Sequence, residues 1–167
     1  MNVKKILFPT DFSTVGDAGL PLATSLARDL GATLIVLHVE EPPLAYGGGE
    51  FYYGLPEPDH PALVKMLNQV KPADPKVSCE HRIRVGDPAS EIVKAAEDES
   101  VGMIVLSTHG RTGMTRFLMG SIAEQVVRKA QCPVLTLKQP AKDKQPGPNV
   151  KQDVVVSTGA EPSLVRK

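Results

Sequence analysis

A polar stretch at residues 107–121, STHGRTGMTRFLMGS, has the residue types best suited to binding chemistry. Its glycines, Gly110, Gly113 and Gly120, would let backbone amides approach phosphate oxygens closely. Arg111 adds a positive charge that pairs well with phosphate. The stretch is not a Walker phosphate-binding loop, because no lysine follows its last glycine. These residue types predict a loop that binds an anion by other means.

The end of this stretch carries signals for the start of a helix. Ser121 and Glu124 have the spacing of a capping box, and the apolar Val126 and Val127 follow. Free backbone N–H groups and the helix dipole at such an N-terminus favour an anion. The Ser121 hydroxyl could cap the helix alone, or cap it and also contact a phosphate.

A second candidate loop follows the first apolar run, at Pro9, Thr10 and Asp11. In an open α/β sheet, ligands bind beyond the carboxyl ends of the strands, where the strand order reverses. If the strands before this loop and before Ser107 are neighbours, the two loops face each other across a crevice. Asp11 would suit ribose hydroxyls or an adenine amine there. It could instead cap the following helix, a role for which Ser13 competes.

The elements that must position these loops begin with short apolar runs, which are typical of strands buried on both faces of a parallel sheet. The segment 77–85 alternates instead, with every second residue apolar or weakly polar, which indicates an edge strand. His38 ends a buried run, and we interpret it as a core residue with a satisfied hydrogen bond. The buried runs are Lys4–Phe8, Thr33–Val39, Met103–Leu106 and Val134–Leu137.

Helical patterns lie between these runs. Apolar residues recur at helical spacing up to Leu30, and Gly31 follows as a C-cap. Pro21 either marks the start of this helix or kinks an earlier turn. Asp87 is the predicted N-cap of another helix, with a proline next, and 61–70 is a shorter candidate. Strands that alternate with helices predict an α/β fold, a parallel sheet with helices on both faces.

Two segments fall outside this alternation. The segment 41–59 is rich in Gly, Pro and Tyr and is too long for an ordinary connection, so we expect a mobile or binding loop. The segment 139–167 is polar with Pro and Gly, so we expect a disordered tail, in which 154–156 could add a small strand. The remainder, 1–138, is predicted to be one domain.

Composition excludes several classes of partner. The formal net charge is zero, which disfavours a nucleic-acid coat or a protein that binds anionic membranes. No apolar run approaches the ~18 residues of a membrane span. Cys79 and Cys132 form no CxxC motif, so we expect reduced thiols in a cytoplasmic protein. The His and Cys residues show no metal-ligand spacing, and no metal ligand or catalytic residue is predicted.

Four segments together resemble a universal stress protein of the UspA superfamily: ILFPTDFS at 6–13, TLIVLHV at 33–39, GDPASEIV at 86–93 and the stretch from 105 to 137. The resemblance covers about residues 3 to 138. The nucleotide signature of that family is G-x2-G-x9-G-[S/T], and Gly110, Gly120 and Ser121 match it. Ser107 stands where the family has its first glycine. Its side chain could crowd a ligand that passes close to the backbone, or hydrogen-bond it.

The resemblance implies a Rossmann-like open sheet of five parallel strands in the order 3-2-1-4-5, which makes strands 1 and 4 neighbours. It also implies a ligand, ATP or else ADP or AMP, with Mg²⁺. Adenine and ribose would contact residues at the ends of strands 1, 2 and 4, namely Pro9, Thr10, Asp11, Val39 and Leu106. The phosphates would contact Ser107, His109, Gly110, Gly120, Ser121 and Ile122.

The paired loops and the glycine spacing predict a regulatory protein that binds a nucleotide, and the resemblance implies that it acts in a stress response and that the nucleotide is an adenine nucleotide. The resemblance also implies a homodimer that pairs through the last strand, which is apolar and carries no protecting charge: Val134, Leu135, Thr136 and Leu137. A protein partner, whose identity the sequence does not give, is expected. Two alternatives stay open. One is a slow ATPase, for which the sequence offers no assigned general base. The other is a dimeric interaction module independent of ATP, which Ser107 favours.

Overall fold

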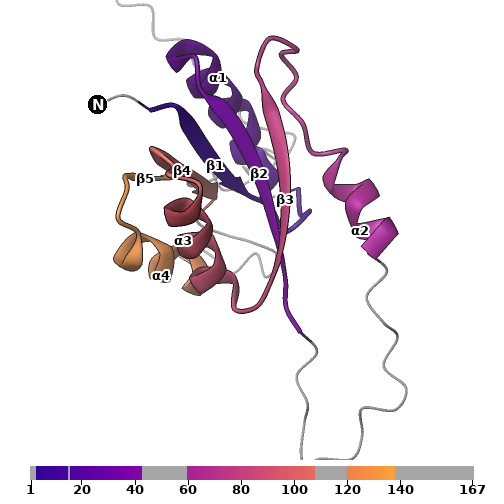
Figure 1. Cartoon of the computed structure of the whole chain (residues 1–167), viewed down its shortest axis with the longest axis vertical. Helices are drawn as coiled ribbons and strands as arrows, with labels where there is room; N and C mark the ends of the chain where they lie inside the picture. The colour runs from indigo at the N-terminus through magenta and orange to yellow at the C-terminus, as the bar shows by residue number, and fades with distance from the viewer. Residues whose placement is uncertain (1–2, 15, 43–59, 108–119, 138–167) are drawn as a thin grey trace, which may run out of the picture.

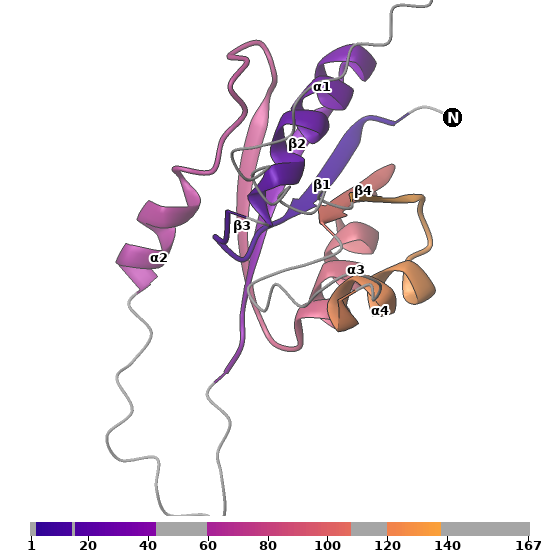
Figure 2. The same cartoon turned by 180° about the vertical axis from the view of Figure 1, so that it is seen from behind.

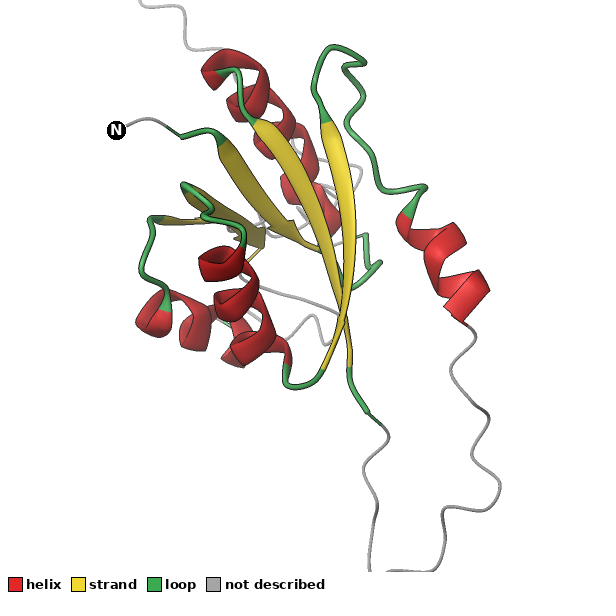
Figure 3. Cartoon of the chain, viewed as in Figure 1, coloured by secondary structure: helices red, strands yellow, loops and turns green. Residues whose placement is uncertain are grey.

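The computed structural model describes residues 3–14, 16–42, 60–107 and 120–137. Its centre is one sheet of five parallel strands in the order β3-β2-β1-β4-β5, drawn in Figures 1 and 3. This order confirms the prediction, and β1 and β4 are neighbours. The strands are β1 (Lys5–Pro9), β2 (Thr33–Glu40), β3 (Cys79–Val85), β4 (Met103–Ser107) and β5 (Val134–Leu137).

Helices cover both faces of the sheet, as the alternation of elements predicts. The helix α1 packs on one face, and α3 and α4 pack together on the other (Figures 1 and 2). The helix α2 lies beyond the β3 edge in both views. The helices are α1 (Leu20–Leu30), preceded by a 3₁₀ turn η1 (Asp17–Gly19), α2 (His60–Leu67), α3 (Pro88–Asp98) and α4 (Ser121–Lys129).

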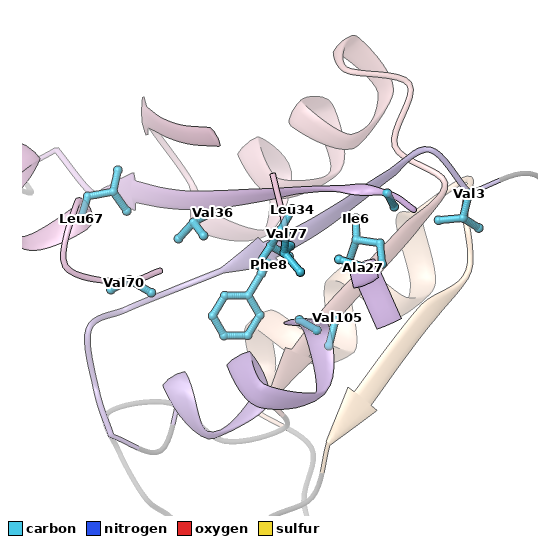
Figure 4. Close-up of a cluster of buried hydrophobic side chains, with 12 residues drawn as sticks. Val3, Ile6, Phe8, Ala27, Leu34, Val36, Leu67, Val70, Val77 and Val105 are labelled. Atoms are coloured by element: carbon cyan, nitrogen blue, oxygen red, sulfur yellow. The ribbon is translucent and has the colours of Figure 1, made fainter. Parts of the chain in front are cut away.

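The central strands are buried on both faces because successive side chains point to opposite sides. On β1, Ile6 and Phe8 enter a core on the α1 side, which Figure 4 shows, and Leu7 enters a core on the α3 side. On β2, Leu34 and Ile35 divide in the same way. This double burial explains why these strands appear in the sequence as unbroken apolar runs.

Local chemistry sets several element ends as predicted. Gly31 has φ 62°, the left-handed conformation of a helix C-cap, and its N–H bonds the carbonyls of Ala27 and Arg28. The Asp87 carboxylate accepts a hydrogen bond from the backbone N–H of Ser90, so Asp87 caps α3. Pro21 lies in the first turn of α1 and does not kink it.

Other ends differ from the prediction. The N-cap of α4 is Gly120, with no side-chain capping bond, and Ser121 is already helical, so the predicted Ser121–Glu124 capping box is wrong. The helix α2 ends at Leu67, three residues early, and single turns continue to Val70. On the edge strand β3, Val85 is 56% exposed because it lies at the strand end, beyond the core.

An ion-pair network joins β3, β1 and the end of α3. The Glu99 carboxylate accepts hydrogen bonds from Lys5 Nζ at 2.9 Å and from Arg82 Nε at 2.8 Å. Arg84 Nη2 lies 2.8 Å from Asp98 Oδ2. These pairs attach the strands β1 and β3 to the C-terminal end of α3.

The predicted loop 41–59 lies outside the described residues except for its first two positions, and the tail 139–167 lies outside them entirely. Among the helices that the structure describes, none is long and apolar enough to cross a membrane.

Candidate functional site

A cavity of about 340 Å³ lies at the carboxyl ends of β1, β2 and β4. Its position is the point where the strand order reverses, which is the usual ligand site of an open α/β sheet. Its volume falls in the range of small-molecule sites. It is lined by Pro9, Thr10, Asp11, Gly16, Leu37, His38, Val39, Glu41, Pro88, Ile92, Leu106, Ser107, Gly120, Ser121, Ile122 and Ala123.

The structure brings together the predicted site residues that it describes. Those from the nucleoside set are Pro9, Thr10, Asp11, Val39 and Leu106, and those from the phosphate set are Ser107, Gly120, Ser121 and Ile122. Four further predicted residues lie outside the described part of the chain: His109, Gly110, Arg111 and Gly113.

Thr10 anchors the loop that follows β1 through hydrogen bonds of its backbone and side chain. It is only 6% exposed, and each of its polar groups has a partner. Its N–H donates to Leu37 O at 2.8 Å, and its carbonyl oxygen lies 2.9 Å from His38 Nδ1. Its hydroxyl donates to Asp17 at 2.7 Å and accepts from the Phe12 N–H at 3.0 Å. These bonds attach the loop to β2 on one side and to the 3₁₀ turn on the other.

Asp11 is held within its own loop. Its Oδ1 accepts from the Ser13 N–H at 3.0 Å and from the Ser13 hydroxyl at 2.6 Å. The N-cap of α1 is Gly19, which has no side-chain capping bond, so the alternative that Asp11 or Ser13 caps this helix is wrong. Burial, together with the nearby Asp11 charge, raises the pKa of Asp17, although the hydrogen bond from Thr10 opposes this.

Ser107 connects the two loops of the cavity. Its hydroxyl donates to the carbonyl oxygen of Gly16 at 2.9 Å. Ser107 ends β4, whereas Gly16 lies in the loop between β1 and α1. The side chain that replaces the expected glycine is therefore engaged with the protein itself.

The N-terminus of α4 forms another wall. Gly120, Ser121, Ile122 and Ala123 all line the cavity. The N–H groups of the first helical turn have no carbonyl partner within the helix, and the helix dipole adds partial positive charge there. This wall can accept an anion, and backbone geometry alone supplies the donors.

Sequence reasoning missed part of the lining. Gly16 lies in a loop without a motif, and Pro88 and Ile92 come from α3, which packs beside the cavity. Glu41 was not predicted as a site residue, although it begins the segment 41–59 that was expected to be a mobile or binding loop. The missed set also includes Leu37, His38 and Ala123. His38 does have the satisfied hydrogen bond expected of it, but it also borders the cavity. The place of His38 at the cavity follows from the register of β2 with β1, which brings Leu37 to the Thr10 N–H. This register is known only once the sheet has folded.

The charges and thiols of the described residues set limits on the chemistry. The charged side chains in the described lining are acidic, Asp11 and Glu41. Within the described ranges, no three His, Cys, Asp or Glu side chains gather as a metal site would require. Cys79 and Cys132 are both free thiols, and burial raises the pKa of each. The described part of the site therefore supplies a cavity, backbone amides at the N-terminus of α4 and the carboxylates of Asp11 and Glu41.

Comparison with known proteins adds the family. The model of the universal stress protein family matches residues 2–138. Universal stress protein MJ0531 of Methanocaldococcus jannaschii is 36% identical over 146 residues, 84% of this chain and 85% of that protein. Universal stress protein MJ0577 of the same organism is 30% identical over 154 residues, 81% of this chain and 95% of that protein.

Solved structures have the same fold. The structure of a universal stress protein in complex with cAMP has a TM-score of 0.62 at 19% identity, over 83% of this chain and 98% of that one. The universal stress protein of Archaeoglobus fulgidus in complex with dAMP has a TM-score of 0.57 at 24% identity, over 81% of this chain and 98% of that one. With the family model and the relatives above, these likenesses agree on one conclusion: the chain belongs to the universal stress protein family.

Proposed function

We propose that this protein binds an adenine nucleotide in the cavity at the ends of β1, β2 and β4, and acts as a regulatory protein of a stress response. The observation that carries the proposal is the convergence of two different chemistries on one cavity. The Asp11 carboxylate borders it from the β1 loop, and the N-terminal amides of α4 border it from another side. A nucleotide has hydroxyls and an amine at one end and an anion at the other.

The nucleoside end would lie between Asp11 and the apolar side chains of Val39 and Leu106. A carboxylate accepts hydrogen bonds from ribose hydroxyls or from an adenine amine. Apolar side chains above and below a base exclude water from it. The similar structures in complex with cAMP and dAMP support an adenine base as the ligand.

The phosphate end would lie at Gly120, Ser121 and Ile122, where the amides of α4 begin. Gly120 lets a phosphate oxygen approach the backbone because it has no side chain. Arg111 and the neighbouring loop residues, together with Mg²⁺, would neutralise the further phosphates of ATP. Binding and orientation of the nucleotide are what this arrangement can do, and we assign no catalytic residue.

Replacement of Gly120 by valine tests the ligand site. The φ of Gly120 is −57°, which residues with side chains adopt without strain, so the fold should survive. The valine side chain would occupy the anion position, and we expect the affinity for ATP and AMP to fall at least about tenfold, or 1.4 kcal/mol. Isothermal titration of the variant and of the wild type measures the two affinities, and a denaturation curve of each protein checks the fold. Unchanged affinity in a folded variant would contradict the proposal.

We further propose a homodimer that pairs through β5. This strand ends the sheet opposite β3 and is short, apolar and uncharged. An edge of this kind tends to pair with another chain unless something protects it. A Thr136→Lys variant places a charge on the edge, and sedimentation equilibrium should then find a monomer where the wild type is a dimer. A monomeric wild type at micromolar concentration would contradict this assembly.

A further inference from the structure

Ser107, at the end of β4, hydrogen-bonds the loop that follows β1. Its hydroxyl donates to Gly16 O at 2.9 Å, across 91 positions of sequence. A serine hydroxyl has one proton, and here that proton is given to the protein. Toward a phosphate, Ser107 would present only oxygen lone pairs. Its chemistry does not fit the phosphate contact that the family resemblance implies for it.

A chain of hydrogen bonds continues from Gly16 to Asp11. The Gly16 N–H donates to the Ser13 hydroxyl oxygen at 2.9 Å, and that hydroxyl donates to Asp11 Oδ1 at 2.6 Å. The Ser13 N–H donates to the same Oδ1 at 3.0 Å. Ser107 is therefore linked to Asp11 through the backbone of Gly16 and the side chain of Ser13.

Close packing reinforces this chain. A β-carbon added at Gly16 would lie only 2.3 Å from Asp11 Oδ1 and 3.0 Å from the Ser13 hydroxyl oxygen. The Gly16 backbone thus bonds Ser107 through its carbonyl and Ser13 through its amide, and the Asp11 carboxylate fills the space where a β-carbon would lie. A shift of Gly16 toward Asp11 would therefore displace the Asp11 carboxylate.

We propose that Ser107 is a positioning residue that sets the Asp11 carboxylate for nucleoside recognition by holding the loop at Gly16. This inference rests on the proposed function, because it assigns Asp11 to the nucleoside. Ser107 then neither crowds the ligand nor bonds it. Recognition of the nucleoside then depends on a side chain at the end of β4, whereas Asp11 lies in the loop that follows β1.

The first test compares adenosine with AMP, because adenosine has no phosphate. We expect Ser107→Ala to weaken both by the same factor, about three- to tenfold, as the loss of one hydrogen bond implies. Ser25→Ala is the matched control, since its hydroxyl also donates to a backbone carbonyl, that of Pro21, away from the cavity. It should leave both affinities unchanged. A loss confined to AMP would show a direct phosphate contact and overturn the inference.

A double-mutant cycle tests whether the effect passes through Asp11. The Asp11→Asn variant already lacks the carboxylate. In this variant, the further substitution Ser107→Ala should lower the affinity for adenosine only slightly. Residues that act through one another give non-additive effects, whereas independent ones add. Full additivity of the two losses would overturn the inference.

A third measurement needs no ligand. The exchange of the Gly16 and Ser13 backbone amides, followed by NMR in the free protein, should be faster in Ser107→Ala and unchanged in Ser25→Ala. Unchanged exchange in Ser107→Ala would overturn the coupling between the loops. If exchange rises as expected but the wild type binds neither adenosine nor AMP, the coupling stands, and the proposed function together with the role in recognition is overturned.

Discussion

The His38 ring fixes the peptide that precedes Asp11. Its Nδ1 lies 2.9 Å from the carbonyl oxygen of Thr10, which can only accept, so the Nδ1 carries the proton. The ring also packs against Phe12, with 4.3 Å between ring centroids. A residue of β2 thereby positions the loop that follows β1, through one hydrogen bond and one ring contact.

Two substitutions separate these contributions of His38. His38→Phe keeps a ring beside Phe12 but leaves the buried Thr10 carbonyl without its donor, which should lower the free energy of unfolding by about 1–3 kcal/mol. His38→Asn keeps a donor near the position of Nδ1 and loses the ring, so it should cost less. Urea denaturation of both variants and the wild type measures the difference. A smaller loss for the phenylalanine variant would mean that ring packing, and not the hydrogen bond, holds the loop.

Alanine at Gly16 should lower the affinity for adenosine, whereas alanine at Gly31 should not. Gly16 has φ −60°, so alanine adds no backbone strain there, but its β-carbon would displace the Asp11 carboxylate. We expect Gly16→Ala to lower adenosine affinity by about tenfold, and to lower stability by about 1 kcal/mol because the displaced carboxylate loses its hydrogen bonds from Ser13. Gly31 has φ 62° with nothing within 4 Å of an added β-carbon. Gly31→Ala should lose about 1–2 kcal/mol of stability and keep its affinity.

Titration and denaturation of the two glycine variants check this pair. Each variant is the control for the other, because the same methyl group is added in both. If Gly16→Ala bound adenosine as tightly as the wild type, the close packing of Gly16 against Asp11 would have no part in recognition.

The stability of the fold should fall in acid through Glu99. Hydrogen bonds from Lys5 and Arg82 lower the pKa of Glu99 from its ordinary value of 4.5 to about 2. A carboxylate with a lowered pKa in the folded state stabilises the fold above its unfolded pKa, and this contribution is lost as the pH falls from about 4.5 to about 2. Because the Lys5 and Arg82 side chains are 35% and 38% exposed, we expect only about 1 kcal/mol.

Neutralisation of Glu99 tests this pH dependence. Glu99→Gln should be less stable than the wild type at neutral pH, and the difference should vanish near pH 2. The control is Glu124→Gln, which removes an exposed pair with Arg128 on α4 and should cost a few tenths of a kcal/mol. An equal loss for Glu99→Gln at neutral and acidic pH would show that its side chain acts through shape and not through charge.

Much of the fold follows from the sequence because local and global signals agree. The apolar runs of β1, β2 and β4 require a sheet covered on both faces, and Gly31 and Asp87 end or begin helices by chemistry that needs no tertiary contact. Ser121 is the exception. Its spacing to Glu124 fits a capping box, but the extended backbone of Gly120, with ψ 147°, starts the helix one residue earlier than that pattern requires.

The candidate site divides in the same way. Thr10 and Asp11 are predictable because they directly follow a buried strand. Gly16 and His38 are not, because their places at the cavity depend on how the β1 loop folds back and on the register of β1 with β2. The partner of Ser107 was equally hidden, since its hydroxyl bonds a backbone atom 91 positions away.

Isothermal titration of the nucleotide-free protein with Mg-ATP and with AMP tests the central claim most directly. Our account predicts micromolar binding of an adenine nucleotide with about one site per chain, and no comparable binding of GMP or Mg-GTP. Absence of binding at millimolar ATP and AMP would contradict it. The cavity would then be inherited from the fold, and the protein would act as an interaction module independent of nucleotide.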